Sequence, residues 1–300
     1  MFVLKDILQA EIVPRLGIKD VIQLKLANTE LYELLTPRKI NELCINKVLM
    51  RLKQIFEDKL DGFLSELCRS GAVVSGSFLI QCILDENWFE VEKSKLEIVG
   101  GEHLASDIDI YVSLTDKYES CPRGDIYHPT TQFETWFFEN NFVYLQYHDT
   151  ERYGDDVSKH IVFIRNFGFV KPGFKVPTTD IMDLDSKLDL NKPTIQVIDI
   201  DFHHSEDAYY LGKKSGEVEP EHSPSSIQNE NIKEFIESSF DFDICKNVFG
   251  VKDNVPYLSI FRLDQIINKI TTYKPIPNRE GSSLKRANKY RKRGFTFFPH

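Results

Sequence analysis

The sequence lacks the features that mark a membrane-spanning or secreted protein. It contains no run of about 18 or more uncharged apolar residues, the length that a transmembrane helix needs. The N-terminal stretch M-F-V-L-K-D-I-L-Q-A-E acquires charge within five positions and has no long apolar core. We therefore expect neither a membrane span nor a secretory signal in this stretch.

Cysteine is scarce and follows no recognisable pattern. The five cysteines are odd in number, lie far apart and never form C-x-x-C. This distribution favours free thiols in a reducing cytoplasm over disulfides or a zinc site, so we expect a cytoplasmic protein. The cysteines are Cys44, Cys68, Cys82, Cys121 and Cys245.

Charge is unevenly distributed along the chain. The 37 Lys and Arg against 46 Asp and Glu give a formal net charge of −9, so the molecule as a whole repels nucleic acid. Acids concentrate in 85–119 and 180–243, whereas 285–293, K-R-A-N-K-Y-R-K-R, carries six basic side chains. Of the 300 residues, 41% are hydrophobic and 12% aromatic, which suffices for the core of one large or two modest domains.

Two aspartates, Asp107 and Asp109, stand at i and i+2 in the apolar run S-D-I-D-I-Y-V. Alternate residues of a strand face one side and rise about 3.3 Å each, so the carboxylates are expected about 6 to 7 Å apart. Such carboxylates are ligands for Mg²⁺, which takes its remaining ligands from phosphate and water. The alternative is a half-buried strand whose polar face carries aspartate by chance.

A Gly-Ser turn precedes this strand. Residues 72–74 predict a short buried strand that ends at S-G-S, and the apolar residues from Phe78 to Leu84 predict a helix after it. The N-terminus of a helix favours anions, so Gly76 and Ser77 are candidates for binding a phosphate through backbone N–H groups and a hydroxyl.

These motifs resemble the DNA polymerase β superfamily of nucleotidyltransferases, which has a hydrophobic-Gly-Ser turn, an Asp-x-Asp strand and a third carboxylate on a later strand. The resemblance implies an α/β (α+β) fold with a mixed sheet flanked by helices. It also implies Mg²⁺ or Mn²⁺ on the three acids and an NTP whose nucleotidyl group moves to a hydroxyl of a protein, an RNA or a small molecule. The third acid would also activate that hydroxyl.

Two segments compete for the third acid. T-I-Q-V-I-D-I-D-F offers Asp199 and Asp201, S-F-D-F-D-I-C-K-N-V-F offers Asp241 and Asp243, and both alternate apolar and acidic residues as a half-exposed strand does. By the strand order of the poly(A) polymerases in this superfamily, 195–200 is the earlier strand and 240–249 the catalytic one. The resemblance therefore favours Asp241 as the third catalytic and metal-binding acid, with Asp243 second and Asp199 third.

Two basic regions are candidates for binding phosphate. Apolar spacing over 258–270 predicts an amphipathic helix, from which the resemblance implies a phosphate-binding Lys269. In the basic run 285–293, Arg291 is a second candidate, and Tyr290 would stack on a base. The alternative is a solvated tail, although the apolar end G-F-T-F-F-P favours docking on the fold. The other basic candidates are Lys289, Lys292 and Arg293.

The N-terminal part predicts two or three short helices, because apolar residues recur at helical spacing with breaks at Gly17 and Pro37. From I-L-Q-A-E to Y-E-L-L it resembles an F-box, the module that docks on the adaptor Skp1 of ubiquitin ligases. This resemblance implies a Skp1-like partner and an alternative function, an adaptor whose nucleotidyltransferase-like body is catalytically silent. A plain helical cap on the core is the other interpretation.

The remaining patterns predict a helix over 45–69 with a glycine C-cap, a helix near 133–140, strands over 142–147 and 161–164, and a loop over 203–231. We expect a helical module over 1–44, a nucleotidyltransferase-like core over 45–250 and a helical, basic segment over 251–300. R-A-N-K-Y-R-K-R-G-F and F-D-F-D-I-C-K-N also look like uncharacterised, F-box-bearing proteins of large DNA viruses and fungi. That likeness implies the host cytoplasm if the chain is viral, and no established activity.

Overall fold

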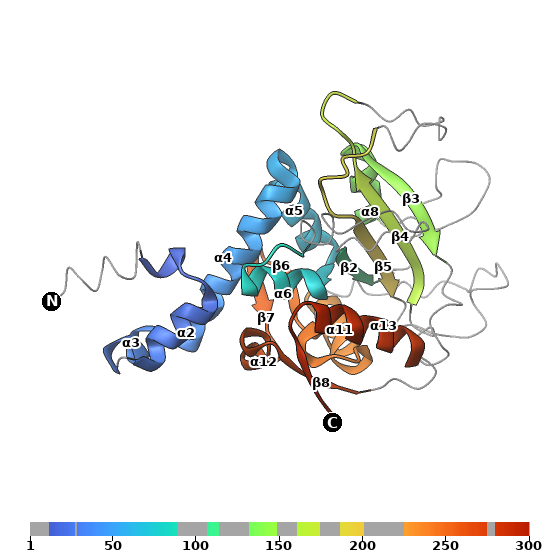
Figure 1. The fold of residues 1–300 in the computed structure, drawn as a ribbon. Helices are drawn as coiled ribbons and strands as arrows, with labels where there is room; N and C mark the ends of the chain where they lie inside the picture. Colours follow the sequence, from blue (N-terminus) through green and yellow to red (C-terminus); the bar gives the residue numbers. More distant parts are fainter. Residues whose placement is uncertain are drawn as a thin grey trace.

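The structure is a computed structural model and describes residues 12–27, 29–88, 107–113, 132–148, 161–174, 187–200, 225–274 and 280–299. Its centre is a seven-stranded mixed sheet in the order β3-β4-β5-β2-β1-β6-β7 (Figure 1). The expected mixed α/β fold is confirmed. The strands are β1 (Val73–Ser75), β2 (Ile108–Ser113), β3 (Phe142–His148), β4 (Ile161–Phe169), β5 (Ile195–Ile200), β6 (Val248–Lys252) and β7 (Val255–Ser259).

Strand pairing brings distant parts of the sequence together around β2. β1 pairs antiparallel with one edge of β2, and Ser75 lies opposite Asp109. β5 pairs parallel with the other edge, and Gln196 lies opposite Asp109 there. Asp109 therefore sits in the middle of the sheet, between two strands that have neutral residues beside it.

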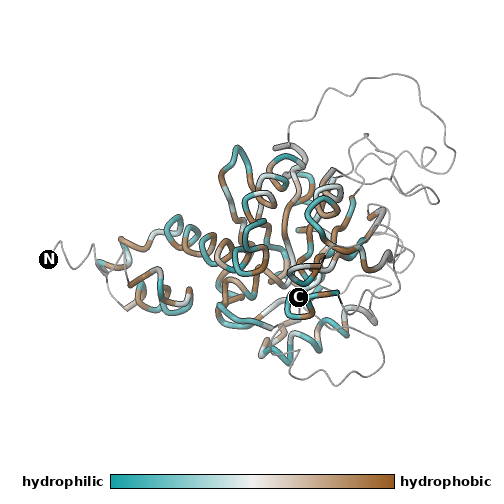
Figure 2. The backbone as a smooth tube through the Cα atoms, turned by 90° about the horizontal axis from the view of Figure 1, so that it is seen from above, coloured by the Kyte–Doolittle hydropathy of each residue, from teal (hydrophilic) through white to brown (hydrophobic). Residues whose placement is uncertain are grey.

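The sheet buries side chains on both faces. On one face, Ile108, Ile110 and Val112 of β2 join the main hydrophobic core, to which several helices contribute. On the other face, Tyr111 and Ile198 pack against α11 (Ser225–Ser239). The hydropathy colouring in Figure 2 shows brown, hydrophobic segments throughout the central body. Helices of the main core include α4 (Pro37–Phe56), α5 (Leu60–Ser70), α6 (Ser77–Leu84) and α8 (Gln132–Glu139).

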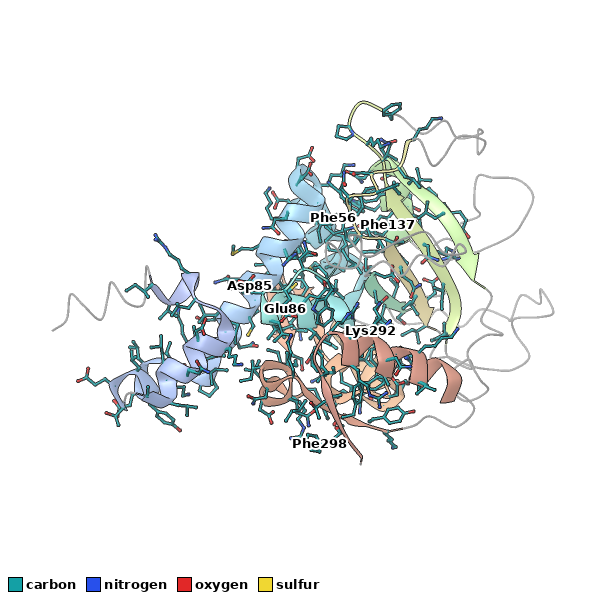
Figure 3. The ribbon with its side chains drawn as sticks, in the orientation of Figure 1. Phe56, Asp85, Glu86, Phe137, Lys292 and Phe298 are labelled. Carbon is teal, nitrogen blue, oxygen red and sulfur yellow. The ribbon has the colours of Figure 1, made fainter. Side chains whose placement is uncertain are left out.

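Aromatic rings fill the core where α4, α5, α8 and β3 meet. Phe56 stacks on Phe63 with ring centroids 4.1 Å apart, and Phe137 meets Phe142 edge-on at 5.0 Å. Figure 3 labels Phe56 and Phe137 in this cluster. Aromatic pairs contribute about 0.5–1.5 kcal/mol beyond the area they bury, so the cluster fixes the helices against the sheet. The predictions of a helix near 133–140 and of strands over 142–147 and 161–164 are confirmed.

The single helix predicted over 45–69 is wrong, because the chain turns at Glu57. α4 ends at Phe56, a 3-10 turn η3 (Glu57–Lys59) follows, and α5 begins at Leu60. Glu57 has φ of 56°. Both helices pack on the same core, so the helical spacing of apolar residues continues across the turn. The sequence pattern therefore does not reveal the turn.

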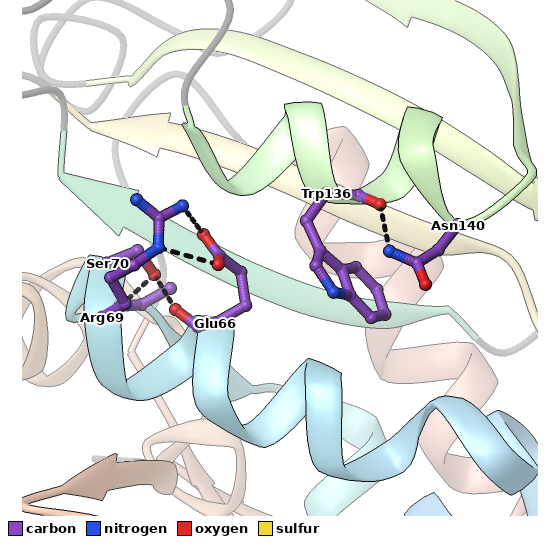
Figure 4. A network of polar contacts seen from close by, with 6 residues as sticks. Glu66, Arg69, Ser70, Trp136 and Asn140 are labelled. Atoms are coloured by element: carbon purple, nitrogen blue, oxygen red, sulfur yellow. Dashed lines mark hydrogen bonds and ion pairs between the residues drawn. The ribbon is translucent and has the colours of Figure 1, made fainter.

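The end of α5 is held by local hydrogen bonds, drawn in Figure 4. Ser70 Oγ donates to the Glu66 carbonyl at 2.7 Å, and Arg69 Nε donates to Glu66 Oε2 at 2.9 Å. Gly71 follows in the left-handed conformation with φ of 66°, so the predicted glycine C-cap is confirmed. This fixed end leads directly into β1 and the Gly-Ser turn.

The described N-terminal helices are short, as predicted. They are the 3-10 turn η2 (Val13–Arg15), α2 (Ile18–Ala27) and α3 (Thr29–Leu34), and both ribbon and tube views show α2 and α3 projecting at the start of α4 (Figures 1 and 2). α2 buries Ile18 and Val21, whereas α3 buries no residue. Residues 1–11 of the predicted module lie outside the described residues.

The helix predicted over 258–270 is also wrong. Leu258 belongs to β7, only Leu263–Asn268 form a helix (α12), and Ile270 begins β8 (Ile270–Tyr273). Lys269, with φ of 52°, ends α12. Alternating strand residues on both sides of a short helix produced a spacing that looks helical throughout.

The C-terminal residues dock on the fold, as expected from their apolar character. After α13 (Glu280–Lys292), β9 (Thr296–Pro299) pairs parallel with β8, and Phe295 is buried. The basic run therefore lies mostly on a packed helix, and the tail alternative is wrong. The predicted loop over 203–231 is wrong from Ser225 onward, where α11 begins, and residues 203–224 lie outside the described residues.

Within the described residues, no helix is both long enough and apolar enough to cross a bilayer. Cys44, Cys68, Cys82 and Cys245 are free thiols, as predicted, and Cys121 lies outside the described residues.

Candidate functional site

A pocket of about 240 Å³ opens between the sheet, α11, the 3-10 turn η5 (Asp243–Cys245) and α13. Seven sequence-predicted residues line it, namely Gly76, Ser77, Asp107, Asp109, Asp241, Lys289 and Tyr290. Arg286 of α13, which was not among the named candidates, lines it as well. Acidic and basic side chains thus share one small pocket with the Gly-Ser turn.

Gly76 fits this place because it has no side chain. Its φ of 79° is strained for other residues, and a Cβ built on it would overlap Oδ2 of Asp109. The turn therefore lies against the second aspartate of the pair. α6 begins at Ser77, so the first N–H groups of the helix, which have no partner within a helix, belong to this end of the pocket.

The environment of Asp109 disfavours its charged form. Burial raises the pKa of Asp109 to about 8, and the neighbouring Asp107 carboxylate adds to the increase. Lys289 and Arg286 oppose it. A bound cation would relieve both the burial penalty and the repulsion between the carboxylates.

Asp241 reaches the pocket from a bend and not from a strand. The predicted strand over 240–249 is wrong in its first part, because η5 follows Asp241 and β6 starts only at Val248. Asp241 is 3% exposed, and its Oδ2 accepts hydrogen bonds from Ser283 Oγ at 2.7 Å and Arg286 Nη2 at 2.8 Å. Both donors come from α13, so Asp241 ties that helix to the pocket.

Asp199 and Asp243, the other two ranked candidates for the third acid, do not line the pocket, and Asp201 lies outside the described residues. Asp199 alternates with Gln196 and Ile198, which do, so it faces the opposite side of the sheet. It is fully buried there in an ion pair with Arg165 and not half exposed as predicted. Asp243 pairs with Lys246 at 2.9 Å and accepts a hydrogen bond from Thr272.

Two basic candidates for phosphate binding, Lys269 and Arg291, lie elsewhere. Lys269 Nζ pairs with Glu86 at 2.6 Å, and the guanidinium of Arg291 lies over the Phe297 ring at 5.0 Å. Neither lines the pocket. Tyr290 does line the pocket, but it is only 4% exposed and its hydroxyl contacts Cys245 Sγ at 3.0 Å, so little of its ring is open to stacking on a polynucleotide.

Sequence reasoning missed Arg286, the basic residue of α13 that contacts Asp241. A signal for it was present in the sequence, because Ser283, Ala287 and Tyr290 form the buried stripe of α13 at helical spacing. Arg286 and Lys289 border that stripe and thus lie beside the core. Helical periodicity within the basic run would have distinguished them from the exposed Arg291 and Lys292.

Sequence reasoning also missed the neutral and apolar lining of the pocket. Gln196 lies beside Asp109, and its Nε2 donates to Asn166 Oδ1 at 3.1 Å. Strand pairing and helix packing assemble these residues, and no local pattern predicts either. The apolar lining residues are Tyr111, Ile161, Ile164, Ile198, Phe235 and Phe240.

The residues fit a divalent cation in part. Asp107 and Asp109 supply the oxygen ligands that Mg²⁺ prefers, and burial, followed by the Asp107 charge, raises the pKa of Asp109, which a cation would offset. Over the described ranges, however, no group of three or more His, Cys, Asp or Glu side chains is arranged to hold a metal ion. The pair is in place, but Asp241 does not complete a three-carboxylate cage.

Comparison of this chain with protein-family models, with curated proteins and with solved structures returns no match. The geometry of the pocket and the motifs that line it are therefore what points to a function.

Proposed function

We propose that this protein is a metal-dependent nucleotidyltransferase, which moves a nucleotidyl group from an NTP to a hydroxyl acceptor. The observation that carries the proposal is the shared pocket, in which a Gly-Ser turn at a helix start meets two adjacent aspartates and two basic side chains. A triphosphate with its cation needs these three elements. The resemblance to the polymerase β superfamily supports the same chemistry.

In this proposal the chain's residues act mainly by positioning and electrostatics. Asp107 and Asp109 hold Mg²⁺ or Mn²⁺, which supplies charge stabilisation to the phosphoryl oxygens when bound. The N–H groups at Gly76 and Ser77, with Arg286 and Lys289, bind the phosphates. The acceptor oxygen forms a bond to the α-phosphorus, the bond to the bridging oxygen breaks, and pyrophosphate leaves.

The apolar lining suits the rest of the nucleotide. Tyr111 and Phe240 lie with ring centroids 5.8 Å apart, and Phe235 lines the same pocket. Apolar and aromatic walls with a few polar groups are typical of sites for small organic ligands. The acceptor is a hydroxyl of a protein, an RNA or a small molecule, and the resemblance assigns its activation to Asp241.

The test is transfer of label from each of four [α-³²P]NTPs with Mg²⁺ or Mn²⁺, to the protein itself and to added RNA. We expect one or more NTPs to label an acceptor, and Asp107→Asn/Asp109→Asn to abolish labelling. Asp58→Asn, at an exposed aspartate outside the pocket, is the matched control. Absence of labelling together with absence of NTP binding would contradict the proposal.

One observation favours the adaptor as a second candidate function. α3 buries no residue, and Leu26 and Tyr32 are 73% and 58% exposed. An exposed apolar surface of this kind is available to a protein partner such as a Skp1-like adaptor. We expect Leu26→Asp/Tyr32→Asp to abolish capture of Skp1 by the full chain, and equal capture by both proteins would contradict the adaptor role.

A further inference from the structure

We infer that Asp241 is a positioning residue that holds Arg286 for an anionic ligand, and that it is not a ligand of the cation at Asp107 and Asp109. This inference rests on the proposed function, because cation and anion are there the two parts of one substrate. It departs from the role that the family resemblance gives to the third acid.

The carboxylate of Asp241 already accepts hydrogen bonds from two side chains. One of its oxygens, Oδ2, accepts hydrogen bonds from Ser283 Oγ and from Arg286 Nη2, at 2.7 and 2.8 Å. Ser283 and Arg286 stand one turn apart on α13, and Ser283 is fully buried. A carboxylate held by a buried hydroxyl and a guanidinium is fixed in direction, which a positioning role requires.

A cation bound by Asp241 would share the carboxylate with Arg286, whose Nη2 lies 2.8 Å from Oδ2. The two positive charges would repel each other, and water screens them little around a carboxylate that is 3% exposed. Turning Asp241 toward the cation instead would break its hydrogen bonds to Ser283 and Arg286. The present pairing is therefore the arrangement that the surrounding charges favour.

The sheet offers no other acid in its place. The residues directly opposite Asp109 on the neighbouring strands are Ser75 and Gln196, both neutral. Among the residues that the structure describes, no third carboxylate completes a metal-binding group. Asp107 and Asp109 would thus bind the cation with water and substrate oxygens as the other ligands, as Mg²⁺ commonly does in proteins.

Arg286 is the side chain that Asp241 holds in position. Its Nη2 is bound to Asp241, while its Nε is buried without a hydrogen-bond partner in the described part of the chain. A guanidinium carries its donors in a rigid fork, so fixing one edge also fixes the direction of the rest. Arg286 lines the pocket with Lys289, and phosphate oxygens are the acceptors that such a fork matches.

The experiment separates cation binding from anion binding on the full-length chain. Mn²⁺ binding is titrated by electron paramagnetic resonance without nucleotide, and inorganic tripolyphosphate binding is measured by calorimetry in EDTA. The variants are Asp241→Asn, Asp241→Ala, Arg286→Ala and Asp109→Asn. The asparagine amide still offers an oxygen to Arg286, whereas alanine does not.

We expect Asp241→Asn to bind Mn²⁺ within about twofold of wild type, whereas Asp109→Asn binds at least about tenfold more weakly. Arg286→Ala should weaken tripolyphosphate binding by about tenfold or more, the effect of losing a charge-assisted hydrogen bond. Asp241→Ala should weaken it several-fold, and Asp241→Asn should bind at least as tightly as wild type. If Asp241→Ala does not fold, Arg286→Lys replaces it and should also bind more weakly, because it keeps the charge without the fork.

Two results would overturn the inference. Loss of Mn²⁺ binding in Asp241→Asn, equal to that in Asp109→Asn, would make Asp241 a cation ligand and leave the proposed function standing. Wild-type tripolyphosphate affinity in Asp241→Ala or in Arg286→Lys would show that Arg286 needs no positioning. A wild-type protein that binds neither probe would contradict the proposed function itself, and the inference with it.

Discussion

At the scale of single residues, the pocket depends on a glycine that nothing larger can replace. Gly76 combines a positive φ with a position in which Asp109 Oδ2 occupies the space that a Cβ would need. These are separate constraints, since the first concerns the backbone and the second the space beside it. Gly173 has a similar φ of 86°, but a Cβ there would meet nothing within 4 Å.

This pair gives a matched test. Gly173→Ala should cost about 1 kcal/mol of unfolding free energy, from backbone strain alone. Gly76→Ala should cost more and should also weaken Mn²⁺ binding, because the methyl group displaces the Asp109 carboxylate. Urea denaturation and Mn²⁺ titration check both variants. Equal losses of stability with unchanged Mn²⁺ binding would show that Asp109 does not depend on Gly76.

Asp109 predicts a distinctive dependence of stability on pH. Its pKa is about 8 in the folded chain, against 3.8 ordinarily, so the folded state holds a proton that the unfolded state loses between these values. Stability therefore falls as pH rises through this range. Asp109→Asn should melt at least about 2 °C higher than wild type at pH 8, with the difference vanishing near pH 4. Asp58→Asn, at an exposed site, should show no such crossover.

At the scale of elements, sequence patterns predicted that strands and short helices exist better than they predicted the residues at which these elements begin and end. The alternation of Ile108, Ile110 and Val112 predicted β2 and its buried face, and Gly71 predicted the end of α5. The strand expected at Asp241 failed because Asp243 turns inward to Lys246, three residues along the chain, and to Thr272, which is close only after folding. Pairings of this kind carry no periodic signal.

The pocket residues likewise fall into those that a local motif predicts and those that only folding brings to the pocket. Gly76, Ser77, Asp107 and Asp109 belong to short local motifs, which a sequence displays directly. Gln196 enters the pocket only because β5 pairs with β2. Arg286 could be distinguished from Arg291 only by its place beside the buried stripe of α13. Local motifs were therefore visible in the sequence, and neighbours created by packing were not.

Substitution of Trp88 tests which contacts hold α13 against the core. This ring is 4% exposed, lies under the Arg293 guanidinium at 4.0 Å and meets Phe295 edge-on. Trp88→Ala should lower the unfolding free energy by about 3–5 kcal/mol and speed hydrogen exchange in α13. Phe298→Ala, the control, removes a ring of β9 that is 52% exposed. It should change the unfolding free energy by about 0.5 kcal/mol or less. Equal effects of the two variants would mean that Trp88 does not secure this helix.

At the scale of the whole molecule, the pocket is assembled from segments spread over most of the chain. Ser77 and Arg286 lie far apart in sequence, yet both line it, and Asp109 lies between them in the chain. A ligand that binds all these segments stabilises the whole fold, because it binds the folded state and not the unfolded one.

Thermal unfolding with Mg²⁺ and an NTP therefore reports on the assembled pocket. At a ligand concentration about 100 times the Kd, stabilisation is about 2.7 kcal/mol, which corresponds to a rise of several °C in Tm. We expect this rise in wild type and not in Asp107→Asn/Asp109→Asn, which lacks the cation ligands. Lys292→Ala is the matched control, since it removes an exposed charge of α13 that does not line the pocket and should keep the full shift. Equal shifts in wild type and in the aspartate variant would place the ion elsewhere, and the pocket would then lose its assignment as a nucleotide site.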